Sequence, residues 1–225
     1  METKTKSFSE QSVISNLKFW GKRAEKTFLF FVLIVLFYTF FMSLTSLSSG
    51  ENGAAEVARQ FRIYAVIMGL MLPLIGIKSF GVPGIGIAMS FGARRSETIW
   101  GIQFMAWLLA IQIFLFVAVG NWLTGGSFKW MGIYLLLLIT GVGAGELMGC
   151  ASMKFGWKGA LLTVLFYCAA AIGGGVLFIC KGGLILILNG ETGKLFLPLL
   201  LVAVLLCVAG ALCWKKILSV YEVKV

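Results

Sequence analysis

The residue types that most often carry out catalysis are scarce in this chain. Its 225 residues include no His, and Asp does not occur anywhere in the sequence. Histidine is the commonest general base and a leading metal ligand, and paired carboxylates perform much hydrolytic chemistry. We therefore predict that the chain is not an enzyme and has no catalytic residue, metal site or cofactor of its own.

One segment approaches the phosphate-binding loop pattern without meeting it. Residues 190–195 read GETGKL, whereas the pattern requires G-x-x-x-x-G-K followed by Ser or Thr. Leu188 stands where the first glycine is needed, and Leu195 has no hydroxyl to bind magnesium. If ATP drives this protein, we expect another polypeptide to bind it.

Glu146 is the one carboxylate within a long apolar run. Intramembrane carboxylates often mark ion or substrate pathways. Near the inner end of its span, however, Glu146 is predicted to reach the interface or pair with Lys154. A role in a pathway is the second interpretation.

The composition is that of an integral membrane protein. Hydrophobic residues make up 60% of the chain, charged residues 12%, and the mean hydropathy is +0.98. About 20 apolar residues cross the hydrocarbon core as a helix. The sequence predicts an all-α integral membrane protein with six transmembrane helices, at Thr27 to Leu47, Ile63 to about Ala88, Ile99 to Leu123, Trp130 to Ala151, Gly159 to Cys180 and Leu195 to Trp214.

Basic residues set the predicted orientation, because Lys and Arg are retained on the cytoplasmic side. With both termini in the cytoplasm, only Arg59, Arg62, Lys129, Lys181 and Lys194 of the 19 basic residues face outward. The formal charge of +10 is then explained by topology and by anionic membrane lipids. We do not predict a nucleic-acid partner.

Residues 1–26 are predicted to form a cytoplasmic interfacial helix with an amphipathic pattern, ahead of a transmembrane domain at 27–214 and a cytoplasmic tail at 215–225. Phe8, Val13, Leu17 and Trp20 fall on its apolar face. A disordered basic tail is the alternative.

Two sets of small or helix-breaking residues predict how the spans pack and bend. Gly141, Gly145 and Gly149 recur every four residues, which predicts a close helix–helix seam within the chain or with a second copy. Pro73 removes the hydrogen bond to Gly69, so these two residues predict a hinge in the second span. Tight packing without motion is the alternative for the hinge.

The inner loop between the second and third spans carries two adjacent arginines. Phe91, Gly92, Arg94, Arg95 and Glu97 combine an apolar knob, a bend and charges, which suits docking into a partner. The alternative is that the arginines only enforce the topology.

Two loop sequences resemble type 2 ATP-binding-cassette (ABC) export permeases. They are MSFGARRSETIWG at 89–101 and SMKFGWKG at 152–159. The resemblance implies a coupling contact with a cytoplasmic ABC ATPase dimer through the residues of the first inner loop. Lys154, Phe155 and Trp157 would form a second, lesser contact. It also implies a second permease copy or paralogue, with ATP and Mg bound by the ATPase.

We expect a multi-pass permease subunit of the bacterial inner membrane that exports hydrophobic or amphipathic cargo such as a peptide toxin, an antibiotic or a lipid. The few polar residues of the spans favour such cargo. A non-transporting membrane scaffold or immunity protein is the first alternative. An ion-coupled carrier is the second.

Overall fold

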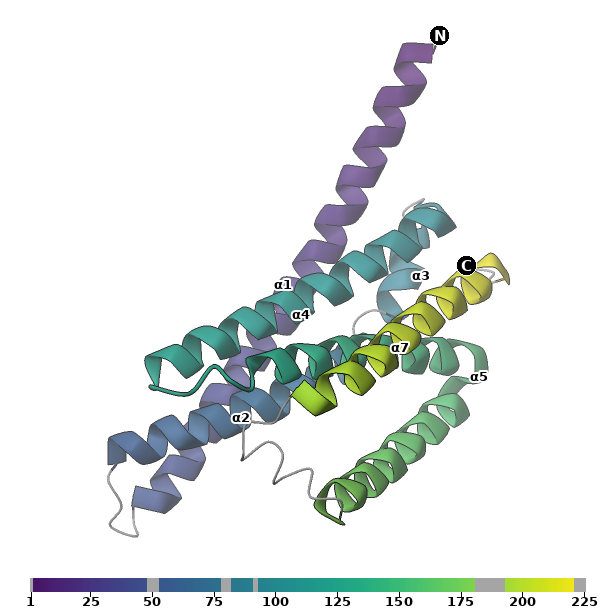
Figure 1. The fold of residues 1–225 in the computed structure, drawn as a ribbon. Coiled ribbons are helices and arrows are strands. Elements are labelled where there is room, and N and C mark those ends of the chain that lie inside the picture. The colour runs from purple at the N-terminus through teal and green to yellow at the C-terminus, as the bar shows by residue number, and fades with distance from the viewer. Residues whose placement is uncertain (1, 48–52, 78–81, 91–92, 181–192, 221–225) are drawn as a thin grey trace.

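The computed structural model describes residues 2–47, 53–77, 82–90, 93–180 and 193–220 (Figure 1). Every regular element in these ranges is helical, as predicted. The elements are α1 (Glu2–Leu47), α2 (Gly53–Gly76), α3 (Val82–Ser90), α4 (Arg95–Leu123), α5 (Met131–Cys180) and α7 (Gly193–Val220).

Four segments of the described residues are long and apolar enough to cross a membrane. The chain is therefore a membrane-embedded, multi-pass helical protein. These segments are Ile14–Leu44, Arg95–Leu123, Met131–Gly159 and Phe196–Leu218. The count of six spans remains a prediction.

The second predicted span was wrong in its extent. Instead of one helix from Ile63 to Ala88, the structure has α2 up to Gly76 and a separate α3 from Val82. Pro83 has no N–H to continue a helix but fits a first helical turn, which accounts for the new start. Pro73 lies inside α2.

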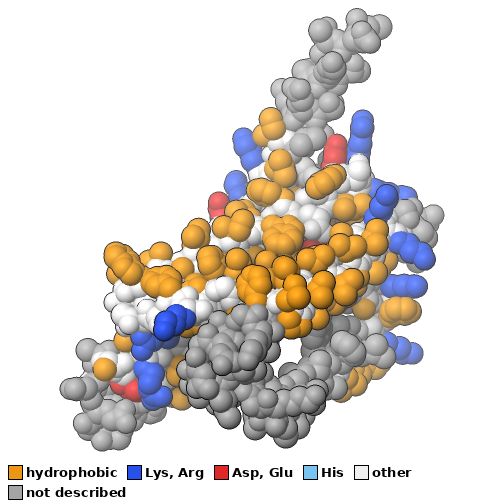
Figure 2. Space-filling model, viewed as in Figure 1, with side chains coloured by type: hydrophobic (Ala, Val, Ile, Leu, Met, Phe, Trp, Pro, Cys, Tyr) orange, Lys and Arg blue, Asp and Glu red, His pale blue; other side chains and the backbone are white. Residues whose placement is uncertain are grey.

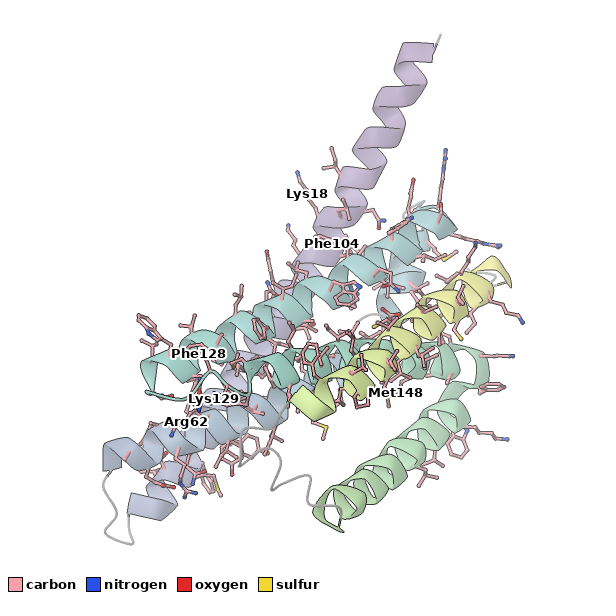
Figure 3. All side chains as sticks on the ribbon, viewed as in Figure 1. Lys18, Arg62, Phe104, Phe128, Lys129 and Met148 are labelled. Atoms are coloured by element: carbon pink, nitrogen blue, oxygen red, sulfur yellow. The ribbon has the colours of Figure 1, made fainter. Side chains whose placement is uncertain are left out.

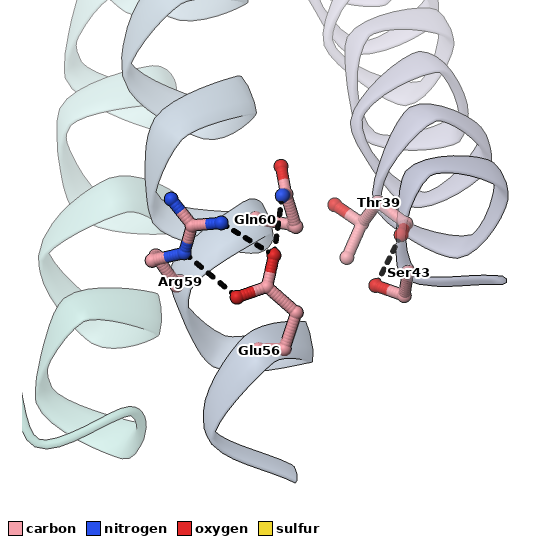
Figure 4. Close-up of polar contacts among 5 residues, drawn as sticks. All are labelled: Thr39, Ser43, Glu56, Arg59 and Gln60. Carbon is pink, nitrogen blue, oxygen red and sulfur yellow. Dashed lines mark hydrogen bonds and ion pairs between the residues drawn. The ribbon is translucent and has the colours of Figure 1, made fainter. Parts of the chain in front are cut away.

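The start of α2 lies ten residues before the predicted one because a polar network extends the helix beyond its apolar run. The Glu56 carboxylate accepts hydrogen bonds from Arg59 Nε and Nη2, both at 2.7 Å, and from Gln60 Nε2 at 2.5 Å (Figure 4). Side chains three and four residues apart meet on one helix face. On neighbouring α1, Ser43 donates to the Thr39 carbonyl within the same close-up.

The N-terminal segment and the first span form one element. Helix α1 passes residue 26 without a break, and its first turns project beyond the rest of the bundle (Figure 1). The division into an interfacial helix and a span is therefore not marked by an interruption of the helix. Its position relative to a membrane remains a prediction.

Helix α5 reverses direction at a single residue. Gly156 has φ 59° and ψ −139°, so α5 is two helices joined by a sharp turn (Figure 1). A Cβ placed on Gly159 would overlap the Ala151 carbonyl, so the chain doubles back tightly there. The turn lies within residues 152–159, where the sequence predicted a loop.

Two buried clusters form the core. One surrounds Trp20, Ile85 and Trp214, near the end of the bundle where α4 begins. The other surrounds Phe31 and Tyr134, toward the opposite end. Glycines let the helices of these clusters approach closely.

Candidate functional site

The predicted coupling residues lie at the start of α4. Arg94 is extended, with φ −69° and ψ 153°, and its N–H donates to the Glu97 carboxylate at 3.0 Å. Arg94 and Arg95 are exposed, and Glu97 is partly buried. The charged helix start expected from the sequence is present. Phe91 and Gly92 lie outside the described residues.

Helix α1 is fixed to this helix start by a side-chain relay that the sequence did not predict. Asn16 Nδ2 donates to the Glu97 carbonyl at 2.7 Å, and Trp20 Nε1 donates to Asn16 Oδ1 at 2.9 Å. The Trp20 ring is fully buried, against Gly101 of α4 and Gly84 of α3. The start of α4 and helix α1 are therefore joined by two hydrogen bonds and a buried ring.

No signal within one segment could have found this contact. Trp20 was placed on the apolar face of α1, which is consistent with its burial. The partner glycines, however, are more than sixty residues away in the chain. Only the small size of Gly84 and Gly101 hinted that a large side chain packs there.

The second set of predicted coupling residues surrounds the turn in α5. Phe155 and Trp157 are among the most exposed aromatic side chains, at 59% and 72%. The Lys154 ammonium lies 5.1 Å from the centroid of the Phe155 ring. The turn in α5 and the start of α4 lie at the same end of the bundle (Figure 1).

The predicted glycine seam lies against helices of the same chain. A Cβ on Gly145 would overlap the Pro73 carbonyl of α2, and a Cβ on Gly149 would lie 2.8 Å from the Trp214 ring of α7. Gly141 faces the Leu70 carbonyl at 3.5 Å by the same measure. The seam thus holds α5 between α2 and α7.

The predicted hinge residues are also closely packed. A Cβ on Gly69 would overlap the Tyr134 hydroxyl and lie 2.9 Å from Ile113. Pro73 is buried beside Gly145. Whether α2 bends at these residues remains a prediction.

Glu146 does not reach the interface, so that part of the sequence interpretation was wrong. Its side chain is fully buried, and neither carboxylate oxygen has a hydrogen-bond partner among the described residues. The Glu146 carboxylate fits beside Gly210 of α7 because glycine has no side chain, and a Cβ on Gly210 would lie 2.5 Å from Glu146 Oε2. The Gln103 side chain faces it from α4. The carboxylate lies among three helices, too deep to extend outward.

We expect Glu146→Gln to unfold at a temperature no lower than the wild type. A buried carboxylate without an ion-pair partner among the described residues is destabilised by desolvation, and glutamine keeps the shape while removing the charge. Thermal unfolding in mild detergent measures this. Glu97→Gln is the matched control and should be slightly less stable, because glutamine can still accept the Arg94 N–H but removes a favourable negative charge from the helix N-terminus. A clear loss of stability in Glu146→Gln would reveal a stabilising partner of the charge.

No group of three or more His, Cys, Asp or Glu residues that could hold a metal occurs in the described part of the chain. Cys150 of α5 and Cys207 and Cys213 of α7 are free thiols. The three are separated in the chain and lie in apolar surroundings, as packing residues do.

Comparisons with protein-family models, with curated proteins and with solved structures found no match for this chain. The assignment to an activity therefore depends on the geometry described above and on the sequence resemblance.

Proposed function

We propose that this chain is the transmembrane permease subunit of an ATP-driven exporter of hydrophobic or amphipathic cargo. Energy enters from a separate cytoplasmic ABC ATPase dimer that binds ATP and Mg. The ATPase contacts the inner loop that leads into α4, with the turn of α5 as a lesser contact. A second permease subunit completes the passage, and both termini lie in the cytoplasm of a bacterial cell.

The observation that carries the proposal is the relay at the start of α4. The exposed Arg94 and Arg95 stand at the N-cap and first residue of a helix that is joined to α1 through Asn16 and Trp20. A partner that pushes on Arg94 and Arg95 would displace α4 and α1 together, because the Trp20 ring is fully buried and packs closely against Gly84 and Gly101. Such rigid coupling is what transmission from an external motor requires.

The turn of α5 supports the same assignment. It presents Phe155 and Trp157 to the same end of the bundle, in the pattern of exposed aromatic anchors that protein interfaces use. Exposed aromatic residues beside Lys154 and Lys158 suit a protein partner as well as the membrane interface.

The charge-reversal variant Arg94→Glu with Arg95→Glu tests the proposal. We expect the purified chain alone to hydrolyse no ATP, and co-expression with its ATPase to give cargo-stimulated hydrolysis that this variant abolishes. The measurement is ATP turnover of the copurified complex in lipid. Lys129→Glu, an exposed lysine at the opposite end of the bundle, should retain full turnover. Wild-type turnover in the double variant would remove the coupling assignment.

A topology control separates lost coupling from wrong insertion, because arginines also orient spans. A single cysteine at exposed Ser96 should react with a membrane-impermeant reagent only after the cells are opened, in both wild-type and charge-reversed chains. Labelling of intact cells would contradict the orientation itself.

The burial of Glu146 favours a second candidate, an ion-coupled carrier. Unpaired carboxylates inside helix bundles are characteristic of ion and proton pathways. Loss of cargo transport in Glu146→Gln, with ATPase binding intact, would favour this function. Unchanged transport would exclude it.

A further inference from the structure

A large apolar groove opens on the surface of the bundle between α1, α4 and α7. Its volume is about 940 Å³, and apolar side chains provide most of its lining. Trp100, Phe104 and Trp107 form one wall, and Leu212 of α7 forms part of the other. Figure 3 labels Phe104 on the side of α4 that faces the viewer.

The groove runs from the charged end of the bundle toward its middle. Trp100 and Trp107 are seven residues apart on α4, which corresponds to about 10 Å along a helix. Both rings are exposed within it. The groove therefore has the apolar character, and over this distance the length, that suit part of a hydrocarbon chain.

The residues at the polar end of the groove favour a ligand with a negatively charged group. Ser96, Glu97, Asn16 and Lys215 line this end. The Glu97 carboxylate accepts a hydrogen bond from the Arg94 N–H. The Asn16 amide nitrogen donates to the Glu97 carbonyl, and its oxygen accepts from Trp20 Nε1. Lys215 is exposed and makes no hydrogen bond or ion pair with the residues that the structure describes. An ammonium is thus the charged group left for a ligand.

The surrounding surface reinforces this preference. Figure 2 shows a broad apolar band bordered by Lys and Arg side chains at the end where α4 begins and α7 ends. The elements that meet at this end carry many basic residues, among them Lys18, Lys22, Arg23, Lys26, Arg94, Arg95, Lys154, Lys158, Lys215 and Lys216. The local field attracts anions from the adjoining leaflet.

We propose that this groove binds one anionic phospholipid of the leaflet at the basic end, with the phosphate of its headgroup on Lys215. One acyl chain lies along Phe104, Trp107 and Leu212. The polar end of the groove shares Glu97 with the contact proposed for the ATPase, but lipid binding in the groove does not depend on transport.

The test is the lipid that stays bound when the chain is released from nanodiscs of equal phosphatidylglycerol and phosphatidylcholine. Native mass spectrometry counts it. We expect one retained phosphatidylglycerol per chain, and a fall of about fivefold in its preference over phosphatidylcholine in Lys215→Gln. Lys216→Gln, which removes the same charge from the adjacent position outside the groove lining, should retain the preference.

A second variant tests the groove itself. Leu212→Trp fills it from an exposed position and should remove the retained lipid whatever its headgroup. Equal loss of preference in both lysine variants would overturn the proposal in favour of diffuse surface charge. Equal retention of both lipids, or lipid that persists in Leu212→Trp, would also overturn it. So would dimers of the chain that disappear in Leu212→Trp, because a second copy would then occupy the groove.

Discussion

Gly101→Leu should lower the free energy of unfolding by about 3 kcal/mol, because the space beside Gly101 is filled by the Trp20 ring. A Cβ at this position would overlap Trp20 Cδ1 and Nε1, atoms at the base of a rigid ring. The far edge of the ring is 2.9 Å from a Cβ built on Gly84, so the ring cannot move away from α4. A fall in melting temperature of about 6 to 12 °C in detergent would be the observed change.

The matched control for this substitution is Gly86→Ala in α3. A Cβ on Gly86 meets nothing within 4 Å, so alanine should leave the melting temperature unchanged or raise it. A double-mutant cycle identifies the cause. Removing the ring in Trp20→Ala should make Gly101→Leu much less harmful than it is alone. Strict additivity of the two losses would show that the clash with Trp20 is not the reason.

The same variant connects stability to the proposed function. Trp20 is held by Asn16, which in turn holds the Glu97 carbonyl at the start of α4. Displacing the ring therefore uncouples α1 from the helix start that carries Arg94 and Arg95. In a complex with an ATPase, we expect cargo transport to fall further than ATPase binding, because the contact surface is retained while its connection to α1 is lost.

Helix ends near charged or turn-forming residues were predictable from the sequence. Leu123 was predicted as the end of the third span and is the last residue of α4. The turn at Gly156 falls inside the predicted loop at 152–159. Both depend on local chemistry, since polar segments and glycine end an apolar helix whatever packs around it.

The features that the sequence did not reveal depend on neighbours far away in the chain. The depth of Glu146 depends on Gly210, which leaves room for a carboxylate in the middle of the bundle. Its own span suggested only that it was near an end. The glycines and Pro83 in the inner half of the second span indicated a weak point, but hydropathy did not show that one helix ends at Gly76 and another begins at Val82.

The relay through Asn16 and Trp20 also depends on residues that are far apart in the chain. Its residues were visible as part of an amphipathic pattern, but their roles follow from which glycines face them. The arginines of the candidate site could be found because charge beside an apolar run is a local signal. The residues that connect them to the bundle could not be found in this way.

Gly156→Ala should destabilise the protein by about 2 kcal/mol through the backbone alone. A Cβ on Gly156 would meet nothing within 4 Å, so steric crowding is not the reason. The cause is the combination of φ 59° and ψ −139°, which only glycine adopts without strain. Thermal unfolding of the variant in detergent measures the loss.

Gly156→Asn distinguishes this explanation from an ordinary left-handed turn. Asparagine tolerates the left-handed helical region, where ψ is near +47°, but Gly156 lies far from it. We therefore expect asparagine to be as harmful as alanine, and Gly132→Ala, at an exposed position in the same helix, to be neutral or stabilising. If asparagine restored stability, the turn would have a different backbone conformation. The positions of Phe155 and Trp157 at the end of the bundle would then need to be reassigned.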